Sequence, residues 1–341
     1  MEDKISVIIF DGGSLQGEVE ELMTKGLHAA LLDTINKMKK VEYFQEFYLV
    51  TNFPQLAARA RPLGVKVYLN SLAPADFHFG RALKELINSE GLHRVFCMGG
   101  GSIPLASMEE LAALGRIICE EKESAVFSNN VQSGDFTAFV PAKAINNIPL
   151  PRQDNALATL LREEAGLAMK LFPNLPGLTF DLDTPTDLLV LGSSSKVGSH
   201  TIACLKELNL DFSRINAAKK VLRGDYQEVF LLGRVGAPVI AYINQNLKVR
   251  LRVLSEERGM KALGRQQRGE VVSLAGCLVE ELGPERFVQQ LSRTAQCVFW
   301  DTRVLFAHFG LHLPDEERFS SDLGLWQKVK QPLVQRLTRA V

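Results

Sequence analysis

The stretch RVFCMGGGSIPLAS, residues 94–107, decides the fold of the first half of the chain. Its apolar start, Val95 to Cys97, is typical of a buried parallel strand and runs directly into glycines. Ser107 stands where the N-cap of a following helix is expected. Strand, glycine turn and helix in this order predict an open α/β sheet with a site at the carboxyl ends of its strands. The side chain at the end of this turn is Ser102, a neutral hydroxyl.

The composition is that of an ordinary globular protein. The chain has 341 residues, enough for two domains, and is 46% hydrophobic and 23% charged. Its 39 Lys and Arg residues balance 39 Asp and Glu residues, so bulk charge favours neither nucleic acid nor a membrane as partner. No leader peptide and no membrane-spanning apolar run is recognised, which predicts a cytoplasmic protein.

Hydrophobic periodicity predicts alternating strands and helices over the first 191 residues, which indicates an α/β fold with a mostly parallel sheet and helices on both faces. The last strand before residue 141 is expected to be antiparallel. The predicted strands are 5–10, 47–51, 65–69, 95–97, 124–128, 136–140 and 178–182, and the main predicted helices are 27–38, one starting at 76, 108–121 and 155–168.

The stretch Gly192–Lys196 is linker-like and is predicted to separate two domains, 1–191 and 197–341. The second domain is predicted to be mostly α-helical. Apolar residues keep helical spacing from Phe287 to Phe309, which predicts one long helix there. A helix also fits 240–254, although alternating apolar and basic residues at 247–253 suit a strand equally well.

The loop from Asp11 to Lys25 is the first candidate site. Gly12 and Gly13 follow the first strand and allow backbone N–H groups to approach a phosphate, with Lys25 as a positive charge at the end of the loop. A flexible connection with a solvated lysine is an equal alternative.

The segment Phe180–Leu188 is the second candidate. Thr184, Pro185 and Asp187 fit the N-cap, first and third positions of a helix, so Asp187 is explained as a cap. Asp183 precedes the cap at the carboxyl end of a predicted strand, where a carboxylate can hold Mg²⁺ against phosphate oxygens.

Together, Gly12-Gly13 with Lys25, GSIPL at 101–105 and DLDTPTDL at 181–188 resemble landmarks of the nucleotidyltransferases, in that family's order. The molybdenum-cofactor guanylyltransferase-like (MobA-like) and phospholactate guanylyltransferase-like enzymes are the most similar, over about residues 1–191. The resemblance implies a Rossmann-like domain that binds a nucleoside triphosphate and Mg²⁺, moves a nucleoside monophosphate onto a small phosphorylated acceptor and releases pyrophosphate. It also implies contacts of the nucleotide with the two glycine turns and a catalytic role for two residues. The implied nucleotide-binding residues are Asp11, Gly12, Gly13, Lys25, Gly100, Gly101 and Ser102; the implied catalytic residues are Lys25 and Asp183, and the implied metal ligands are Asp183 and Ser102.

Two positions depart from that family. Ser14-Leu15-Gln16 stands where an Arg usually follows the glycines, and Ser102 stands where the family has a metal-binding Asp. Because a hydroxyl is a much poorer Mg²⁺ ligand than a carboxylate, three outcomes stay open: a rearranged metal site, weak activity, or binding without turnover. Asp11, also at a strand end, is a candidate to compensate.

Further polar residues are candidates for contacts with the acceptor or a phosphate, with a polar surface loop or structural ion pairing as the alternative in each case. Arg250 and Arg252 alternate with apolar residues, and Asp301 is expected to pair with one of the arginines of this basic stretch. The candidates are Asn129, Asn130, Ser133, Gly134, Asp135, Arg250 and Arg252. Asp154 and Asn155 are read as a helix N-cap pair. His308 and His312 have no carboxylate at ligand spacing, so no metal site is predicted there.

The sequence therefore predicts an Mg²⁺-dependent nucleotidyltransferase whose second domain covers the cleft or mediates a homodimer. A catalytically degenerate nucleotide-binding or regulatory protein with the same fold is the alternative, because of Ser102. A nucleotide-sugar glycosyltransferase is the weaker alternative, suggested by Asp181-Leu182-Asp183, which has the spelling of an Asp-x-Asp metal motif.

Overall fold

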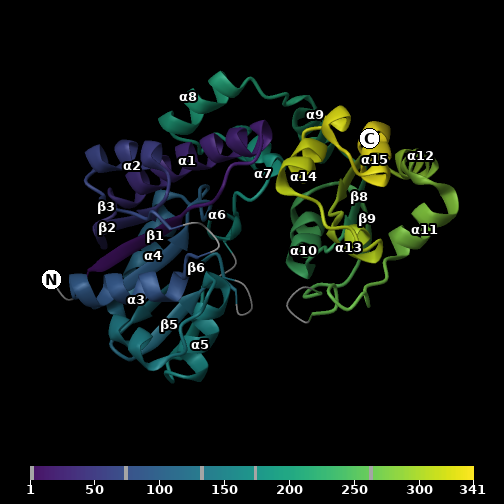
Figure 1. Cartoon of the computed structure of the whole chain (residues 1–341). Helices are drawn as coiled ribbons and strands as arrows, with labels where there is room; N and C mark the ends of the chain where they lie inside the picture. The colour runs from purple at the N-terminus through teal and green to yellow at the C-terminus, as the bar shows by residue number, and fades with distance from the viewer. Residues whose placement is uncertain (1–3, 73–75, 131–133, 173–174, 261–263) are drawn as a thin grey trace. The chain divides into compact units, whose positions relative to one another are not determined.

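The computed structural model describes residues 4–72, 76–130, 134–172, 175–260 and 264–341 (Figure 1). The chain divides into two compact units. The first holds the residues up to Gln16 and Glu21–Leu210, and the second holds Gly17–Glu20 and Asp211–Val341. The grouping thus changes after Leu210, whereas the sequence predicted a boundary at 192–196.

The first unit is built on a seven-stranded sheet with the order β3-β2-β1-β4-β6-β5-β7 among the described residues. All neighbours are parallel except β6, which runs antiparallel to β4 and β5. This is the predicted mostly parallel α/β sheet, including its antiparallel strand. The strands are β1 (Ile5–Asp11), β2 (Phe44–Thr51), β3 (Lys66–Leu69), β4 (Val95–Gly99), β5 (Ala125–Ser128), β6 (Phe136–Val140) and β7 (Ala168–Leu171).

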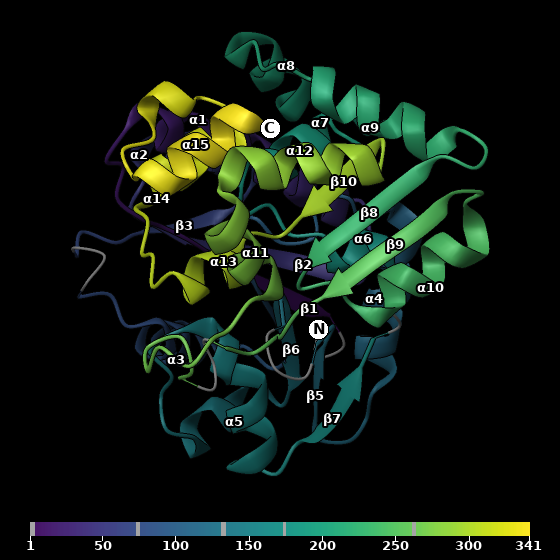
Figure 2. The same ribbon diagram turned by 90° about the vertical axis from the view of Figure 1, so that its right-hand side faces the viewer.

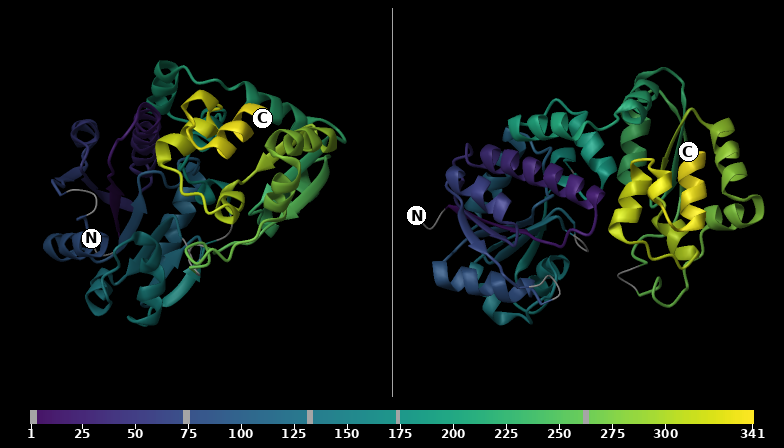
Figure 3. Two further views of the ribbon diagram at one scale, coloured as in Figure 1. Left: turned by 45° about the vertical axis from the view of Figure 1, so that its right-hand side comes forward. Right: turned by 45° about the horizontal axis from the view of Figure 1, so that its top comes forward.

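Helices cover both faces of this sheet, because successive side chains of a strand point to opposite faces. Ile5, Val7 and Ile9 pack with α1, α2 and α4, whereas Ile8 packs with α3 and α5. Figure 3 shows the purple helix α1 and the blue helix α3 on opposite sides of the sheet. The helices are α1 (Glu18–Met38), α2 (Pro54–Ala60), α3 (Phe79–Glu90), α4 (Met108–Glu120), α5 (Leu157–Glu163), α6 (Pro176–Thr179), α7 (Pro185–Gly192) and α8 (Ser199–Leu208), with 3₁₀ turns η1 (Arg61–Leu63), η2 (Ala142–Asn147) and η3 (Asp154–Ala156).

Two predicted elements of the first unit are wrong. The helix predicted for 155–168 stops at Glu163, and the chain turns at Gly166 (φ 71°) before it enters β7. The strand predicted for 178–182 is absent: α6 occupies its start, and Asp181 makes only an isolated antiparallel bridge with Ser102.

Two of the three predicted helix caps of this unit are confirmed. The third is wrong: Asp154 and Asn155 lie within the 3₁₀ turn η3, and the N-cap of α5 is Ala156, which makes no side-chain capping bond. The Ser107 side chain accepts from the Glu110 amide and the Glu110 side chain accepts from the Ser107 amide, which forms a capping box at the start of α4. Thr184 and Asp187 form the same arrangement at the start of α7. These caps fix where the chain leaves the glycine turn and the 181–183 segment.

The second unit has helices around a three-stranded parallel sheet of order β10-β8-β9 among the described residues (Figure 2). Leu232 of β8 packs with buried residues of α11, α12, α13 and α15, including Phe287 and Leu305. Its elements are α9 (Ser213–Arg223), β8 (Glu228–Gly233), α10 (Ala237–Asn246), β9 (Arg250–Ser255), α11 (Leu274–Leu282), α12 (Pro284–Thr294), β10 (Cys297–Trp300), α13 (Arg303–His308), α14 (Asp315–Asp322), η4 (Trp326–Lys328) and α15 (Pro332–Ala340).

Helices predominate in this unit as predicted, but the long helix predicted for 287–309 is wrong. The backbone turns extended at Ala295 (φ −154°), and Cys297–Trp300 pairs with β8 as β10. Short apolar runs do not distinguish a buried strand from a helix by periodicity alone. For 247–253 the strand alternative is the correct one, because Arg250–Ser255 forms β9.

Among the described helices of both units, none has the length and apolarity needed to cross a bilayer.

Candidate functional site

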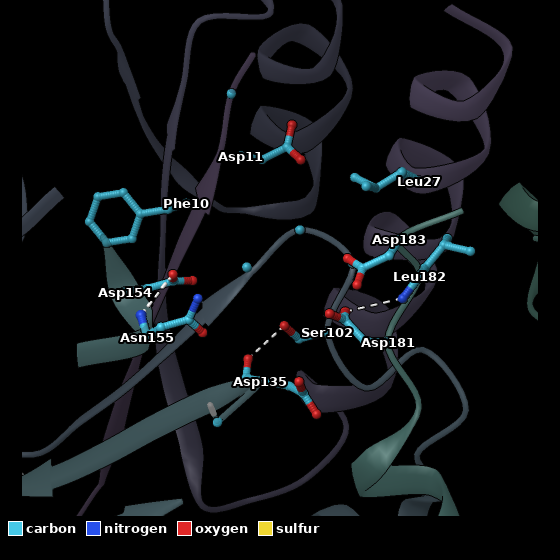
Figure 4. A pocket seen from close by; sticks show the side chains of 15 residues that line it. Phe10, Asp11, Leu27, Ser102, Asp135, Asp154, Asn155, Asp181, Leu182 and Asp183 are labelled. Carbon is cyan, nitrogen blue, oxygen red and sulfur yellow. Dashed lines mark hydrogen bonds between the residues drawn. The ribbon is translucent and has the colours of Figure 1, made fainter. Parts of the chain in front are cut away.

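A cavity of about 410 Å³ lies at the carboxyl ends of β1 and β4 (Figure 4). It is lined by the two strand ends with their glycine turns, by Gly134–Asp135 before β6, by Asp154–Asn155 and by 181–183. An open α/β sheet places its ligands at this edge. Of the candidate residues named from the sequence, the structure therefore brings together Gly12, Gly100 and Gly101 of the two glycine turns with Ser102, Asp135 and Asp183, whereas Gly13 is not among the lining residues.

Five carboxylates line this cavity. Among the residues that the structure describes, the lining contains no Lys or Arg to neutralise them. Grouped and partly desolvated carboxylates repel one another and favour either protonation or a bound cation. The five are Asp11, Asp135, Asp154, Asp181 and Asp183.

Asp181 is the most perturbed of them. Burial raises its pKa well above its ordinary value, and the neighbouring carboxylates of Asp183 and Asp135 raise it further. Asp181 is held there by its bridge to Ser102 and by the Leu182 amide, which donates to the Gly101 carbonyl at 3.0 Å. A strongly raised pKa in a cleft marks a candidate functional residue.

Asp135 is positioned by Asn129. The side-chain nitrogen Nδ2 of Asn129 donates to Asp135 Oδ2 at 2.7 Å and to the Leu178 carbonyl at 2.7 Å. In return, the backbone amide of Asp135 donates to Asn129 Oδ1 at 3.0 Å. Burial raises the pKa of Asp135 although the Asn129 bond lowers it. Asn129 thus supports a carboxylate of the cavity without lining it, and Asn130 also lies outside the lining.

Asp11 faces the cavity from the end of β1. Its Oδ2 lies 2.9 Å from Nε2 of His28 on α1, and the two side chains are 8% and 10% exposed. A Cβ atom at Gly100 would lie 2.2 Å from Asp11 Oδ1, so only glycine fits opposite this carboxylate. The position of the Asp11 carboxylate therefore depends on that glycine.

Ser102 is almost fully buried, with 4% of its surface exposed. Its hydroxyl donates to the Asp135 carbonyl at 2.7 Å, which commits the hydroxyl hydrogen to the protein. The backbones of Ser102 and Asp181 form an antiparallel bridge. A carboxylate of the 181–183 segment therefore lies beside the neutral Ser102.

Lys25 is not part of the cavity. The loop after β1 ends at Gly17, because α1 begins at Glu18, and Lys25 lies on that helix. Its ammonium pairs with Glu21 at 2.7 Å, and more than half of its side chain is exposed. Gly13 is instead fixed by Asn52, whose side chain accepts from the Gly13 amide and donates to the Gly13 carbonyl.

The predicted arginines belong to the second unit. Arg250 and Arg252 lie on β9 and pair with Glu228 at 3.2 and 3.3 Å. The expected pairing with Asp301 is wrong: Asp301 pairs with Arg234 and Arg303. Gly134 lines the cavity, and Ser133 lies outside the described residues.

The sequence interpretation missed Asp154, Asp181 and His28 as residues of this site. Asp154 was explained as a cap, and Asp181 was noted only for its spelling with Asp183. The spelling was the usable signal for Asp181, because residues two apart in an extended segment point to the same side and can both reach one cavity. His28 gave no local signal, since its partner Asp11 lies on a different element.

No protein-family model matches the chain, and no curated protein matches it. Several solved structures have a similar fold. A cytidylyltransferase from Leptospira borgpetersenii serovar Hardjo-bovis is 14% identical, with a TM-score of 0.42, over 60% of this chain and 94% of its own. A nucleotidyl transferase from Methanothermobacter thermautotroptrophicus is 15% identical, with a TM-score of 0.38, over 60% of this chain and 98% of its own.

A third similar structure is CMP:2-keto-3-deoxy-manno-octonic acid synthetase in complex with CTP. It is 13% identical, with a TM-score of 0.37, over 50% of this chain and 89% of its own. At such identities a likeness concerns the fold, and the function of this chain has to be argued from its own side chains.

Proposed function

We propose that the first unit binds a nucleoside triphosphate together with a divalent cation and transfers its nucleotidyl group to a small phosphorylated acceptor, releasing pyrophosphate. The observation that carries this proposal is the set of five carboxylates facing two glycine turns at the carboxyl ends of β1 and β4. The glycine turns let phosphate oxygens approach the backbone, and the carboxylates supply oxygen ligands.

The charge of the cavity makes the cation necessary. A triphosphate placed beside Asp181 and Asp183 would meet carboxylates and no lining Lys or Arg among the described residues. Anions of this kind repel each other unless a cation lies between them. Mg²⁺ fits best, because it prefers oxygen ligands and binds through one or two carboxylates together with substrate phosphates.

Asp181 and Asp183 are the residues we assign to the cation. They enter the cavity side by side in Figure 4, and the pKa of Asp181 is raised by burial and by the charge of Asp183. A bound cation would relieve that repulsion and supply charge neutralisation for the phosphates. Gly12, Gly100 and Gly101 would contact the nucleotide through their backbone.

A binding or regulatory protein without turnover is the second candidate. Ser102 favours it, because its hydroxyl hydrogen is committed to the Asp135 carbonyl and the side chain brings no charge to the cavity. Lys25, which the resemblance implied for the phosphates, points to Glu21 instead. Both features weaken the catalytic set without preventing a nucleotide from binding.

Transfer of a glycosyl group from a nucleotide sugar is the third candidate. It is favoured by Asp181 and Asp183, which both line the cavity as an Asp-x-Asp pair would. This candidate and the first share the nucleotide and the cation, and differ in the bond that breaks.

A thermal-shift screen separates the three. The full chain is heated with each of the four ribonucleoside triphosphates and with nucleotide sugars, with and without Mg²⁺. A ligand that binds only the native state raises Tm by mass action. At a ligand concentration of 100 times Kd, the free energy of unfolding increases by about 2.7 kcal/mol. We expect one triphosphate to raise Tm only with Mg²⁺. An Mg²⁺-independent rise favours the binding protein, a rise with nucleotide sugars alone favours glycosyl transfer, and no rise at all contradicts nucleotide binding.

Activity is then tested by pyrophosphate release with Asp183→Ala and Asp181→Ala. We expect both variants to lose release while they keep the unfolding transition of the parent protein. Lys25→Ala is the control, because Lys25 lies outside the cavity and pairs with Glu21. Unchanged release in both aspartate variants would contradict the assignment.

A further inference from the structure

The second unit contains a group of three potential metal ligands on α11 and α13. Cys277 and Glu280 are three residues apart on α11, which places them on one face of that helix. His308 is the last residue of α13. One ligand atom from each of the three lies within 4.8 Å of the others, and they form the one such group of His, Cys, Asp and Glu among the described residues.

Gly276 explains why the imidazole comes so close to α11. A Cβ atom at this position would lie 2.2 Å from Cδ2 of His308 and 2.8 Å from its Nε2. The ring therefore packs against the helix backbone, where any larger residue would displace it. Around it, Ala275, Val279 and Leu305 join α11 and α13 in one buried cluster, which holds the three ligands in register.

The Nε2 atom of His308 has unused bonding capacity. The side chain is 11% exposed, and Nε2 is buried without a hydrogen-bond partner in the described part of the chain. Its nearest carboxylate oxygen is Glu280 Oε1, at 3.4 Å. Buried polar atoms normally have a hydrogen-bond partner. A nitrogen that faces a thiol, and lies at ion-pair distance from a carboxylate without a hydrogen bond to it, indicates a missing group between them.

We propose that Cys277 Sγ, the Glu280 carboxylate and His308 Nε2 bind a Zn²⁺ ion, with solvent in the fourth position. A thiolate, an imidazole and a carboxylate are the three kinds of side chain that hold zinc in proteins. The thiolate and the imidazole select against Mg²⁺, which prefers oxygen ligands. This site is thus chemically distinct from the carboxylate cavity of the first unit, and it stands independently of the proposed function.

The proposed site is accessible to an ion from solvent, and ion binding would stabilise the second unit. More than half of the Glu280 side chain is exposed, so the site is reached from solvent without unfolding. Binding would tie α11 to the end of α13 and stabilise the second unit. One contact is lost: the Ser273 amide donates to His308 Nδ1 at 3.4 Å, a long and weak bond, and zinc on Nε2 moves the ring proton to Nδ1.

The sequence interpretation found no metal site at His308 because it paired His308 with His312 and found no carboxylate at ligand spacing from the two. His312 is exposed and lies outside the group. The thiol and the carboxylate come from a helix about thirty residues earlier in the chain, a distance over which spacing rules carry no information.

The experiment uses the full chain, reduced and freed of metal with a chelator, and titrates it with Co²⁺ as a spectroscopic probe for Zn²⁺. We expect visible bands of tetrahedral Co²⁺ together with a near-ultraviolet band from thiolate-to-metal charge transfer, and one equivalent of Zn²⁺ should remove both. Excess Mg²⁺ should leave them unchanged. A parent protein without the thiolate band would overturn the proposal.

Variants assign the bands to residues. Cys277→Ser should lose the thiolate band, whereas the matched control Cys297→Ser should keep it, because Cys297 lies on β10 in the same unit but outside the group. Glu280→Gln changes an exposed side chain and should fold normally, while its affinity for Zn²⁺ falls by about 10–100-fold or more. Zn²⁺ should raise Tm of the parent and of Cys297→Ser, but not of Cys277→Ser. A band lost in Cys297→Ser and kept in Cys277→Ser, or an unchanged affinity in Glu280→Gln, would contradict the site.

Discussion

Nε2 of His28 lies 2.9 Å from Oδ2 of Asp11, and the two side chains are among the most buried ionisable pairs of the first unit. The His28 ring also packs edge-on against Phe53, with ring centroids 4.9 Å apart. The pair therefore fixes one oxygen of Asp11 and leaves the other opposite Gly100, at the wall of the cavity. A carboxylate that faces the ligand space is held in place by a residue on the helix behind it.

Replacing His28 with Leu should destabilise the protein. The change leaves the buried Asp11 oxygen without its donor, which costs about 1–3 kcal/mol of unfolding free energy. Urea denaturation measures the difference. His312→Leu is the control, because His312 is exposed and should change stability little. Equal effects of the two changes would show that the Asp11 contact contributes nothing.

Gly100→Ala should distort the cavity. The new Cβ would lie 2.2 Å from Asp11 Oδ1 and 3.0 Å from a Leu27 methyl carbon, so Asp11 must leave its position. Overpacking of this kind typically costs about 1–3 kcal/mol. Gly13→Ala is the matched control for stability, because its Cβ would meet only Phe53 Cζ at 4.0 Å. Thermal unfolding of both variants checks the prediction, and a Gly100→Ala protein as stable as Gly13→Ala would contradict it.

The stability of the metal-free protein should fall as the pH rises. Because the folded-state pKa of Asp181 is raised by burial and by Asp183, the folded protein keeps a proton that the unfolded chain releases at about pH 4. This contribution to stability is complete below that pH and is lost as the pH rises past neutrality through the folded-state pKa. Tm against pH in a chelating buffer should therefore fall less steeply for Asp181→Asn than for the parent.

Asp225→Asn is the control for that pH series. Asp225 is exposed in the second unit and lies 3.8 Å from Lys248 Nζ, so its substitution should leave the slope of Tm against pH unchanged. If Asp181→Asn keeps the parent slope, the Asp181 carboxylate is ionised in the folded protein and its pKa is not raised.

The predictions from sequence were most accurate for features that depend only on the residues of a single helix or strand. Leu83, Leu86 and Ile87 of α3 are spaced for one helix face and are all buried, and the caps Ser107 and Thr184 are readable from four consecutive residues. Such features depend on local geometry, which a short window contains. The carboxyl ends of β1 and β4 could be placed at one edge for a different reason, because the alternation of strands and helices along the chain predicts a parallel sheet.

The remaining features depend on contacts between distant residues. Asp181 lies beside Ser102 only because the 181–183 segment bridges to the glycine turn, and the sequence suggested a strand there instead. Cys297–Trp300 is a strand because β8 pairs with it, although its apolar spacing also fits a helix. Tertiary pairing overrides a local preference in both cases.

Asp33→Ala should weaken α8. The buried Asp33 carboxylate on α1 accepts from the amides of His200 and Thr201 at 3.1 and 2.8 Å, and it serves as the missing cap because the N-cap residue is Gly198. Loss of a cap costs about 0.5–2 kcal/mol. Hydrogen exchange of the amides in 199–208 should speed up in Asp33→Ala and change less in Asp33→Asn, which keeps an acceptor oxygen. Exchange at the parent rate in Asp33→Ala would show that α8 does not depend on this cap.

Ser102→Asp tests whether the neutral residue faces the proposed cation site. The new carboxylate would lie in a position with 4% exposure, beside Asp181, and would remove the donor of the Asp135 carbonyl. Without a cation, the added charge has no partner in the lining, so we expect a loss of at least about 1–3 kcal/mol of unfolding free energy.

With Mg²⁺ the sign of the effect should reverse, because an additional carboxylate strengthens the binding of a cation held by Asp181 and Asp183. The rise of Tm on adding Mg²⁺ should therefore be larger in Ser102→Asp than in the parent. Ser102→Ala separates the two contributions: it loses the same 2.7 Å hydrogen bond but adds no charge, so it should be mildly destabilised and respond to Mg²⁺ like the parent. If both variants respond equally to Mg²⁺, residue 102 does not reach the cation, and Asp181 and Asp183 would have to hold it without a ligand from position 102.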